Sequence, residues 1–528
     1  MLEAGLACCV SVGVFLLIIR LLGEHQFRVQ WTEQERMPEQ SLKEGCLHEA
    51  LQALMVDDLD DSSLVYPLDD AEIALLTRIH LADQAVSCLE VQYYLFHDDS
   101  TGQAMLAALV EAAKRGVQVR LLLDDMDTWR REARLRRLME ETPQLEIRIF
   151  NPFLLRFARL PEYIARFPRI TRRMHNKSFS VDAITSIVGG RNIGNEYFNF
   201  NPEVAFADLD VLIGGTSVAA IVKAFEEYWY SGLAVELKRL AEPASDTEYL
   251  PWRAQLDQSL KRYRDNLLKH QERIDRWRWA APLDLHEGPL RLLFDDPYKV
   301  VSKFSETGGN MVPELLALLR SAQHELVIAS PYFVPAKHGL ATLATLRERG
   351  VKITIVTNSY AANDVPVVHA GYINYRKRLL KLGVNIYEVI SKNERQKRRF
   401  FKKHQPNKQH AWSLLGSKRA SLHAKAFIVD REKVFVGSFN LDPRSMIHNT
   451  EMGIVFENPT YAAQTVQNLQ GYVEDRAYKV QLDEQDRLIW QRQNADGSEQ
   501  VLRHEPDMSL IQKIFIRAIA LLPVEWLL

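Results

Sequence analysis

Two stretches of the chain carry histidine, lysine and aspartate at the same spacing, in the order H-x-K-x-x-x-x-D. The first motif comprises His175, Lys177 and Asp182, and the second comprises His423, Lys425 and Asp430. Seven residues after each aspartate, a glycine begins a Gly-x-x-Asn sequence, which ends at Asn192 in the first copy and at Asn440 in the second. A single H-x-K pair is usually solvated or structural, whereas two complete copies in one chain indicate a shared chemical role.

On a strand, the histidine and lysine of each motif would point to the same face, because residues i and i+2 do so. A histidine can attack phosphorus and divide a difficult displacement into two easier steps. A second, protonated histidine can give its proton to the leaving alkoxide. Two lysines and two asparagines can donate to the nonbridging oxygens, so Asn192 and Asn440 are expected to bind the substrate phosphate. The motifs predict phosphodiester chemistry, and we expect neither a metal nor another cofactor.

Each histidine also needs a partner that orients its second ring nitrogen. Asp208 lies 33 residues after His175, and Glu451 lies 28 residues after His423, each at the start of a strand-like run. A single acid in such a position is usually a surface charge, but the matched positions make these two the candidate histidine-orienting residues. We place the two motif aspartates in the catalytic set, although we expect them to brace a junction of strand and loop.

The elements around the motifs are duplicated as well. A strand, a helix that ends in Arg-Gly and a second strand occupy residues 89–123, and the same order returns at 326–356. Glycine after the last helical residue, here Gly116 and Gly350, is a stop signal. Helices that alternate with strands predict an α/β domain with a largely parallel sheet, present twice.

These units divide the chain into two domains with a linker and two terminal segments. A charged stretch at 252–279 has helical composition and predicts a pair of linking helices. The expected boundaries are a membrane anchor at 1–30, a first domain at 31–235, a helical linker at 236–286, a second domain at 287–480, and a tail with an amphipathic helix at 481–528.

The paired motifs resemble those of the phospholipase D superfamily over roughly residues 65–480. Within it, the chain is most similar to bacterial cardiolipin synthases of the C type, on the stretches 91–94, 173–198 and 421–451. The resemblance implies two phospholipase D-like domains, each a mixed sheet flanked by helices, packed with pseudo-twofold symmetry around one active site. It also implies a covalent phosphatidyl-histidine intermediate, with His175 as the nucleophile and His423 as the acid and base.

The same resemblance implies transfer of a phosphatidyl group, from phosphatidylethanolamine or phosphatidylglycerol, to a second phosphatidylglycerol. Capture of the intermediate by water would instead make the protein a hydrolytic phospholipase D that releases phosphatidic acid, and the sequence leaves this alternative open. An inactive membrane scaffold would be expected to have lost part of one motif, and both are complete. A nuclease is less favoured because the N-terminus is apolar, and nucleic acid is not an expected partner.

Three segments suggest contact with a membrane. Residues 4–19 carry no charge, which favours an uncleaved anchor over a buried helix or a signal sequence. Residues 392–419 are strongly basic and suit an anionic lipid surface, although nucleic acid or a solvated loop would also fit. Residues 510–522 are apolar at helical spacing, as in an interfacial helix or a helix packed on the second domain. The expected location is the bacterial cytoplasmic membrane; the side that the active site faces and any accessory protein stay open.

The composition sets broad limits on the chain. Its 528 residues have a formal net charge of −2, which gives no global signal for nucleic acid or anionic membranes. Hydrophobic residues at 47% and charged residues at 25% are typical of a folded protein. The four cysteines lack the spacing of a zinc site or a disulfide framework, and we expect them to be small buried residues.

Overall fold

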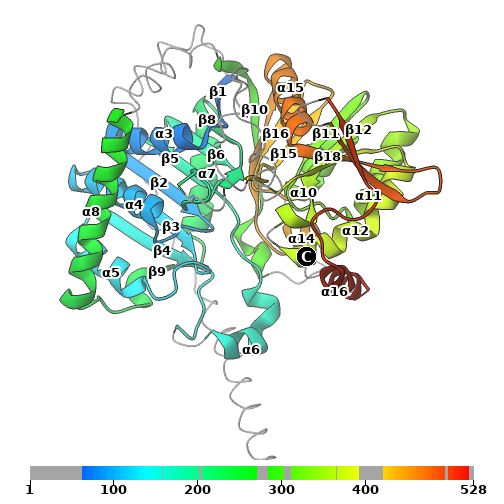
Figure 1. Cartoon of the computed structure of the whole chain (residues 1–528). Coiled ribbons are helices and arrows are strands. Elements are labelled where there is room, and N and C mark those ends of the chain that lie inside the picture. Colours follow the sequence, from blue (N-terminus) through cyan, green and yellow to red (C-terminus); the bar gives the residue numbers. More distant parts are fainter. Residues whose placement is uncertain are drawn as a thin grey trace, which may run out of the picture.

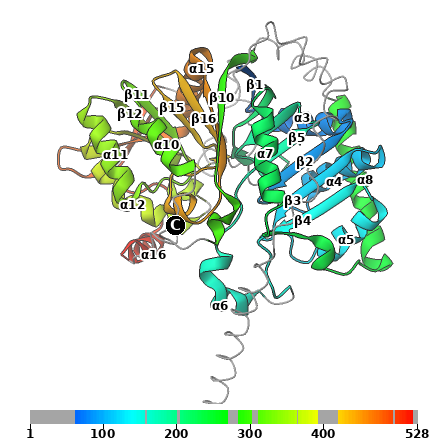
Figure 2. The same cartoon turned by 180° about the vertical axis from the view of Figure 1, so that it is seen from behind.

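The computed structural model describes residues 62–156, 159–200, 205–269, 284–301, 311–363, 365–391, 420–493 and 497–521. The expected anchor at 1–30 and the basic stretch at 392–419 lie outside these residues. The chain forms two α/β halves that lie side by side (Figure 1), and the view from behind shows the same division (Figure 2).

The first half contains a sheet and the helices that cover it. Its elements are β1 (Ser62–Leu68), α3 (Ala71–Gln84), β2 (Cys88–Tyr93), α4 (Ser100–Lys114), β3 (Gln118–Asp124), α5 (Glu132–Glu141), β4 (Leu145–Phe150), α6 (Leu160–Ile170), β5 (Ser178–Val181), β6 (Thr185–Gly189), β7 (Ala205–Ala207), β8 (Asp210–Gly215), α7 (Val218–Trp229), β9 (Ala234–Glu236), η2 (Leu237–Arg239) and α8 (Asp246–Lys269).

The second half repeats this order and extends it at the C-terminal end. Its elements are β10 (His286–Phe294), η4 (Pro297–Val300), α10 (Met311–Arg320), β11 (Glu325–Ala329), α11 (Ala336–Glu348), β12 (Lys352–Asn358), η5 (Tyr360–Ala362), α12 (Pro366–Lys381), β13 (Asn385–Val389), β14 (Ala420–Leu422), β15 (Ala426–Val429), β16 (Lys433–Gly437), α14 (Pro443–Ile447), β17 (Met452–Glu457), α15 (Pro459–Arg476), β18 (Ala477–Leu482), β19 (Leu488–Gln493), β20 (Glu499–Leu502) and α16 (Leu510–Ala520).

Each half contains a mixed sheet, which confirms what the family resemblance implies and corrects the largely parallel sheet that the alternation of helices and strands suggests. Strands β2, β3 and β4 are parallel, as are β11, β12 and β13. Beyond them, β5, β6, β8 and β1 add antiparallel strands in the first half, and β15, β16, β17 and β10 do so in the second. The connections between β5 and β6 and between β15 and β16 are too short for the crossover that a parallel pair needs.

The two sheets are continuous through β1 and β10. These equivalent strands pair with each other antiparallel, with Val65 opposite His286 and Ser62 opposite Pro289, as a twofold axis between them requires. A hydrophobic core also fills the space between the halves. It contains side chains of α7 and the β8 region on one side and of α15 and the β17 region on the other, including Val211, Ile221, Ile454 and Val466. The halves therefore form one packed unit.

The helix stops predicted from glycine are confirmed. Helix α4 ends at Lys114 and α11 ends at Glu348, and the chain then turns through Gly116 and Gly350, whose φ angles are 104° and 86°. Residues other than glycine rarely adopt such positive φ angles. In both halves the turn leads directly into the middle parallel strand.

The linker forms one described helix, where the sequence suggested a pair. Helix α8 packs along α4 with a stripe of buried side chains, Trp252, Leu256, Leu260 and Tyr263. These residues recur every three or four positions, so one face of the helix belongs to the core of the first half. Residues 270–283 lie outside the described part of the chain.

The motif aspartates cap the loops that precede β2 and β11. The carboxylate of Asp182 accepts from the backbone N–H groups of Val86, Ser87 and Cys88 at 2.7–3.0 Å. The carboxylate of Asp430 accepts in the same way from the N–H groups of residues 323–325 at 2.7–2.8 Å. Each aspartate therefore ties the end of its own strand, β5 or β15, to the loop before the neighbouring strand, β2 or β11, as we expected.

Asp182→Ala should lower the free energy of unfolding by about 3 kcal/mol, because three N–H groups lose a charged acceptor. Denaturant unfolding measures this change. Asp182→Asn, which keeps one acceptor oxygen, should lose less. Below its melting temperature, the alanine variant should retain measurable turnover, and a loss as deep as that of a histidine variant would show that Asp182 acts in the chemistry.

Candidate active site

The two histidines lie just before strands β5 and β15, in segments that pair with the opposite half. Met174, before the first histidine, bridges to Thr450, and the N–H of His175 donates to the carbonyl of Thr450 at 2.8 Å. In the equivalent place, β14 pairs with β7, and the N–H of His423 donates to the carbonyl of Ala207 at 2.7 Å. Backbone contacts across the interface thus fix both histidines.

The carboxylates that orient the histidines are exchanged between the halves. Nδ1 of His175 lies 2.8 Å from Oε2 of Glu451, and Nδ1 of His423 contacts Oδ2 of Asp208. The acid that follows each histidine in the sequence therefore serves the histidine of the other repeat. With Nδ1 held by a carboxylate, Nε2 is the nitrogen left for chemistry.

The lysines of the motifs lie beside their histidines. Nζ of Lys177 donates to the carbonyl of His175 at 2.6 Å, and Nζ of Lys425 donates to the carbonyl of His423 at 2.6 Å. Nζ of Lys425 also lies 3.0 Å from Nε2 of His423. Both lysines are buried. Burial lowers the pKa of Lys177 well below its usual range, an effect that Glu451 opposes and Lys425 reinforces.

The electrostatics of His175 indicate that the two motifs form one site. Burial is the main cause that lowers the pKa of His175 well below its usual value, and the charges of Lys177, Lys425 and His423 act in the same direction. Residues from both halves therefore lie close enough to influence a single imidazole. His175 is neutral near pH 7, which is the form that can act as a nucleophile.

The two carboxylates differ in their charge state. Burial raises the pKa of Glu451 to about 7, although Lys177 and the hydroxyl of Ser438 oppose this shift. For Asp208, burial acts upward, but the charges of His423 and Lys425 prevail and hold its pKa well below the usual range. Asp208 is therefore ionised beside His423, whereas Glu451 faces a neutral His175.

Different buried groups support the two acids. The guanidinium of Arg191 donates to the backbone carbonyl of Asp208 at 2.6 Å. The N–H of Glu451 donates to Asp295, which forms an ion pair with Lys299 at 2.7 Å. Sequence reasoning missed Asp295 and Lys299, since they lie outside the motifs. Arg191 lies inside the first Gly-x-x-Asn sequence, where Phe439 takes its place in the second copy.

Aromatic rings surround the imidazoles. The ring of Tyr94 lies 5.1 Å from that of His175, between centroids, and Nζ of Lys177 lies 5.6 Å from the same tyrosine ring. The rings of Tyr197 and Phe206 lie 5.3 and 5.0 Å from that of His423. These contacts restrict water around the histidines. The sequence analysis did not assign these rings to the site.

The two candidate phosphate-binding asparagines occupy unequal environments. Oδ1 of Asn192 accepts from the N–H of Leu95 at 3.2 Å, and its Nδ2 donates to the hydroxyl of Tyr197 at 2.9 Å. Asn440 is also buried, and its Oδ1 has no hydrogen bond among the described residues. Asn192 thus contacts Tyr197, whose ring lies beside His423, whereas the motif aspartates stay at the loops that they cap.

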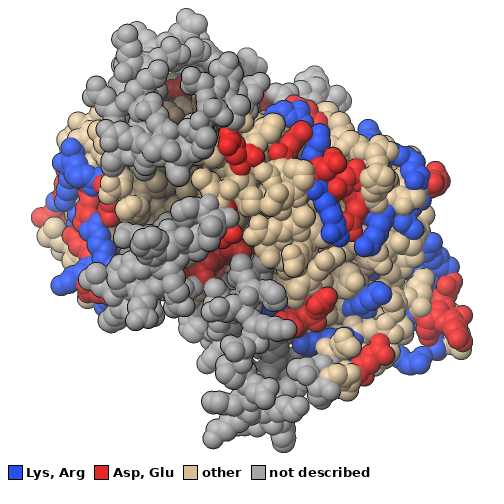
Figure 3. Space-filling model, turned by 90° about the horizontal axis from the view of Figure 1, so that it is seen from above, with Lys and Arg blue, Asp and Glu red and all other residues tan. Residues whose placement is uncertain are grey.

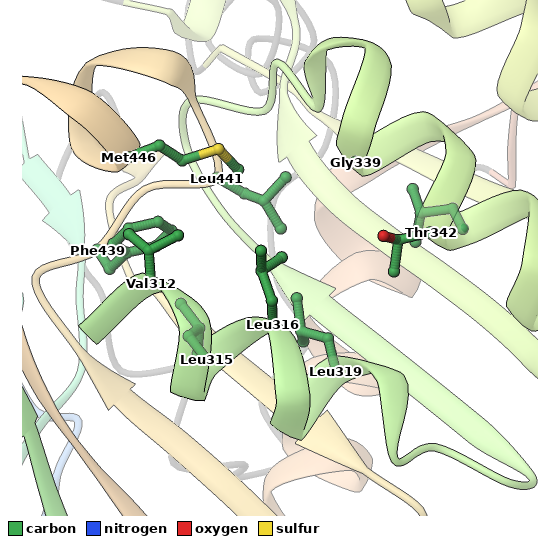
Figure 4. Close-up of a pocket in the computed structure, with 10 residues that line it drawn as sticks. Val312, Leu315, Leu316, Leu319, Gly339, Thr342, Phe439, Leu441 and Met446 are labelled. Carbon is green, nitrogen blue, oxygen red and sulfur yellow. The ribbon is translucent and has the colours of Figure 1, made fainter. Parts of the chain in front are cut away.

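An apolar cavity lies beside the segment that carries Asn440. Figure 4 shows Phe439 and Leu441, its two neighbours, turned toward Leu315 and Leu316 of α10 and Met446 of α14. This cavity has no charged lining residue. Binding of a phosphate group is therefore expected at the histidines and lysines, not there.

The described residues contain no group of three or more His, Cys, Asp or Glu side chains arranged to hold a metal ion. Within the same residues, no helix combines the length and apolar character that crossing a membrane requires. Cys88, the one cysteine that these residues include, is free and buried, as expected for a small core side chain.

The chain is similar to known proteins over most of its length. Residues 77–229 and 315–473 match the family described as "Cardiolipin synthase, PLD-like domain". The chain is 40% identical over 478 residues to cardiolipin synthase C of Escherichia coli (strain K12), which covers 88% of this chain and 96% of that protein. It is 26% identical to a cardiolipin synthase of Geobacillus sp. (strain WCH70), over 73% of this chain and 61% of that protein.

A solved structure is similar in fold. The phosphatidylserine synthase of Haemophilus influenzae Rd KW20 superposes with a TM-score of 0.55 at 15% identity, over 91% of this chain and all of that one. The family match spans both halves, and the similarity to the Escherichia coli protein extends over nearly its whole length. The chain therefore belongs to the cardiolipin synthase family of phospholipase D-like phosphatidyltransferases.

Proposed function

We propose that the protein joins two phospholipids into cardiolipin, with phosphatidylglycerol as the acceptor and either phosphatidylglycerol or phosphatidylethanolamine as the donor. The observation that carries the proposal is the exchange of carboxylates, which unites two histidines in one buried site, one beside Glu451 and the other beside Asp208. One imidazole is suited to attack and the other to supply a proton, as a two-step transfer requires.

In the first step, Nε2 of His175 attacks the donor phosphorus and forms an N–P bond. The P–O bond to the donor headgroup breaks, and His423 gives its proton to the departing alkoxide. In the second step, neutral His423 removes a proton from a hydroxyl of phosphatidylglycerol, whose oxygen then attacks phosphorus and displaces His175. Each step forms one bond to phosphorus and breaks another, and His423 ends the cycle protonated.

The lysines act on the phosphate. Burial depresses the pKa of Lys177, and an anionic phosphate between the two lysines would favour their charged forms. Their ammonium groups, with the amide of Asn440, can then donate to the nonbridging oxygens as charge moves through the transition state. Asp208 and Glu451 act as positioning residues, since each touches a histidine.

The hydrolytic alternative uses the same intermediate with water in place of the second lipid. The aromatic rings around the histidines limit water and support transfer over hydrolysis. We also propose that the protein works at the bacterial cytoplasmic membrane, where its lipid substrates lie. An inactive scaffold is disfavoured by the complete histidine and lysine sets.

His175→Ala and His423→Ala should each reduce cardiolipin formation by at least about a thousandfold, because each removes one step of the cycle. The assay uses vesicles of phosphatidylglycerol and phosphatidylethanolamine, with lipid products identified by mass spectrometry. His338→Ala changes an exposed histidine of α11 and serves as the control. If the wild type produced phosphatidic acid alone, the protein would be a hydrolase and not a synthase.

The roles of the two histidines can be separated with a donor whose leaving group needs no proton. In His423→Ala, a phosphatidyl donor carrying p-nitrophenol should release about one equivalent of p-nitrophenolate and leave a phosphatidyl adduct on His175. His175→Ala should release none. Peptide mapping locates the adduct, and an adduct on His423 would reverse the assignment.

The two carboxylates should affect stability with opposite dependence on pH. The pKa of Glu451 is raised from 4.5 to about 7, so the folded protein binds the extra proton between these values. The stability of the wild type relative to Glu451→Gln should therefore fall by about 3 kcal/mol as the pH rises through this interval. Denaturant unfolding at each pH measures the difference.

Asp208→Asn is the matched control for that experiment. The pKa of Asp208 is held below its usual value, so its ionised form stabilises the folded state above pH 3.8. Asp208→Asn should be less stable than the wild type at neutral pH, and the gap should close only in strong acid. A Glu451→Gln difference that does not vary with pH would contradict the raised pKa.

A further inference from the structure

Helix α6 has its polar and apolar faces reversed. Glu162 and Arg166 form an ion pair on the buried face, and the exposed face carries Leu160 and Ile164, one turn apart, followed by Pro168 beyond a kink at Arg166. The side chains of Leu160 and Ile164 are 72% and 65% exposed. A helix on a protein surface in water normally buries such residues and exposes its charges.

Helix α16 in the second half also turns apolar side chains outward, although Arg517 is exposed as well. A capping box at Ser509 begins the helix, which packs along α12 and buries Ile516. Its outer face is a continuous apolar stripe that includes Ile511 at 80% exposure and Phe515 at 59%, together with Leu510, Ile514, Ala518 and Leu521. The sequence left open whether this stripe lies at a membrane interface or packs on the second domain. In the structure the stripe is exposed and does not pack on the second domain.

Both helices lie at the same end of the molecule in Figures 1 and 2. Helix α6 ends at Ile170, five residues before His175, and Arg444 of α14 donates to the carbonyl of Thr171 in between at 2.6 Å. In the second half, α12, which carries α16, follows η5. The carbonyl of Ala362 in η5 accepts from the hydroxyl of Ser421, two residues before His423. The two helices are therefore connected to the segments that hold the histidines, α6 directly and α16 through α12 and η5.

The surroundings of α6 are rich in arginine and contain an exposed tryptophan. Burial, together with the charges of Arg166, Arg173 and Arg172, lowers the pKa of Arg169 to about 9. An anionic group nearby would relieve this crowding of positive charge. Trp129, which is 43% exposed, lies under the guanidinium of Arg159, and such aromatic side chains favour the interface of a bilayer. At the opposite end, seen from above in Figure 3, acidic and basic side chains are mixed over the described surface.

We propose that the exposed faces of α6 and α16 together dock on an anionic phospholipid bilayer, so that the active site faces the lipid surface. Two helices from different halves, each with a row of apolar side chains turned outward, match an interfacial binding surface. The docking is independent of the chemistry, but the supply of lipid to the histidines rests on the proposed function.

The first test locates the bilayer by photo-crosslinking. The full chain is reconstituted in vesicles of phosphatidylglycerol and phosphatidylethanolamine, with benzoylphenylalanine at Ile164, at Ile511 or, as a control, at Val86. Val86 is 52% exposed and precedes β2, whose other end leads to Tyr94 beside His175. Lipid adducts should form at Ile164 and Ile511 but not at Val86. Adducts to protein alone, from this chain or a second copy, would overturn the proposal.

The second test separates docking from chemistry. Ile164→Glu combined with Phe515→Glu places charge on both exposed faces, where the core is not disturbed, and Val86→Glu with an unchanged α6 and α16 is the control. Turnover of vesicle lipid should fall at least about tenfold in the double variant, because each charge opposes burial of its helix in lipid. Turnover of a short-chain phosphatidylglycerol, dissolved as monomers, should stay within about twofold of the wild type.

The outcomes distinguish the two proposals. Unchanged turnover of vesicle lipid in the double variant would contradict docking through these faces. Loss of monomer turnover as well, with a folded protein by circular dichroism, would contradict a role confined to the membrane. A wild type that forms lipid adducts but makes no cardiolipin would leave the docking surface in place and remove the proposed reaction.

Discussion

The exchange of carboxylates between the halves is the constraint on which the rest of the structure depends. Glu451 and Asp208 are almost fully buried, and each finds its histidine only in the opposite repeat. A half on its own would contain a buried acid without that partner, and an unpaired buried charge is strongly destabilising. The antiparallel pairing of β1 with β10 and the shared core between the halves hold the repeats in the register that this exchange needs.

Duplication explains the geometry of the site, and divergence explains its chemistry. Two equal halves would produce two equal histidines, which could not differ in protonation by sequence alone. Here an aspartate faces one histidine and a glutamate faces the other, and their supports differ as well, Arg191 behind the first and Asp295 with Lys299 behind the second. Small changes around a symmetric frame are therefore sufficient to favour a base on one side and an acid on the other.

Much of the site could be predicted from sequence because its residues follow local patterns. The H-x-K spacing predicts that both side chains share a face, although each H-x-K lies just before its strand, and the glycine stops determine where the neighbouring helices end. Which acid serves which histidine depends on contacts between residues 276 positions apart for His175 and 215 apart for His423. No local pattern carries that information, and the same is true of Lys299 and Asp295.

The direction of the strands and the faces of the helices were harder to predict for a related reason. Alternating helices and strands suggested a parallel sheet, but the hairpin of β5 and β6 adds strands without helices. The apolar stripe of α16 has the same spacing whether it meets a protein core or a lipid surface, so its periodicity could not decide between them. Helix α6 provides the distinguishing feature, because its ion pair of Glu162 and Arg166 occupies the inner face.

A site that is buried between two halves raises the question of how two lipids reach it. His175 and His423 are 8% and 6% exposed, so little more than a headgroup can approach them. If α6 and α16 lie on the bilayer, the acyl chains of both lipids can stay in the membrane while their phosphates reach the histidines. Since α6 belongs to the first half and α16 to the C-terminal extension of the second, both halves would present the site to donor and acceptor from the same surface. The packing of the two halves would then have two consequences: it unites the catalytic groups and it orients them toward the lipid.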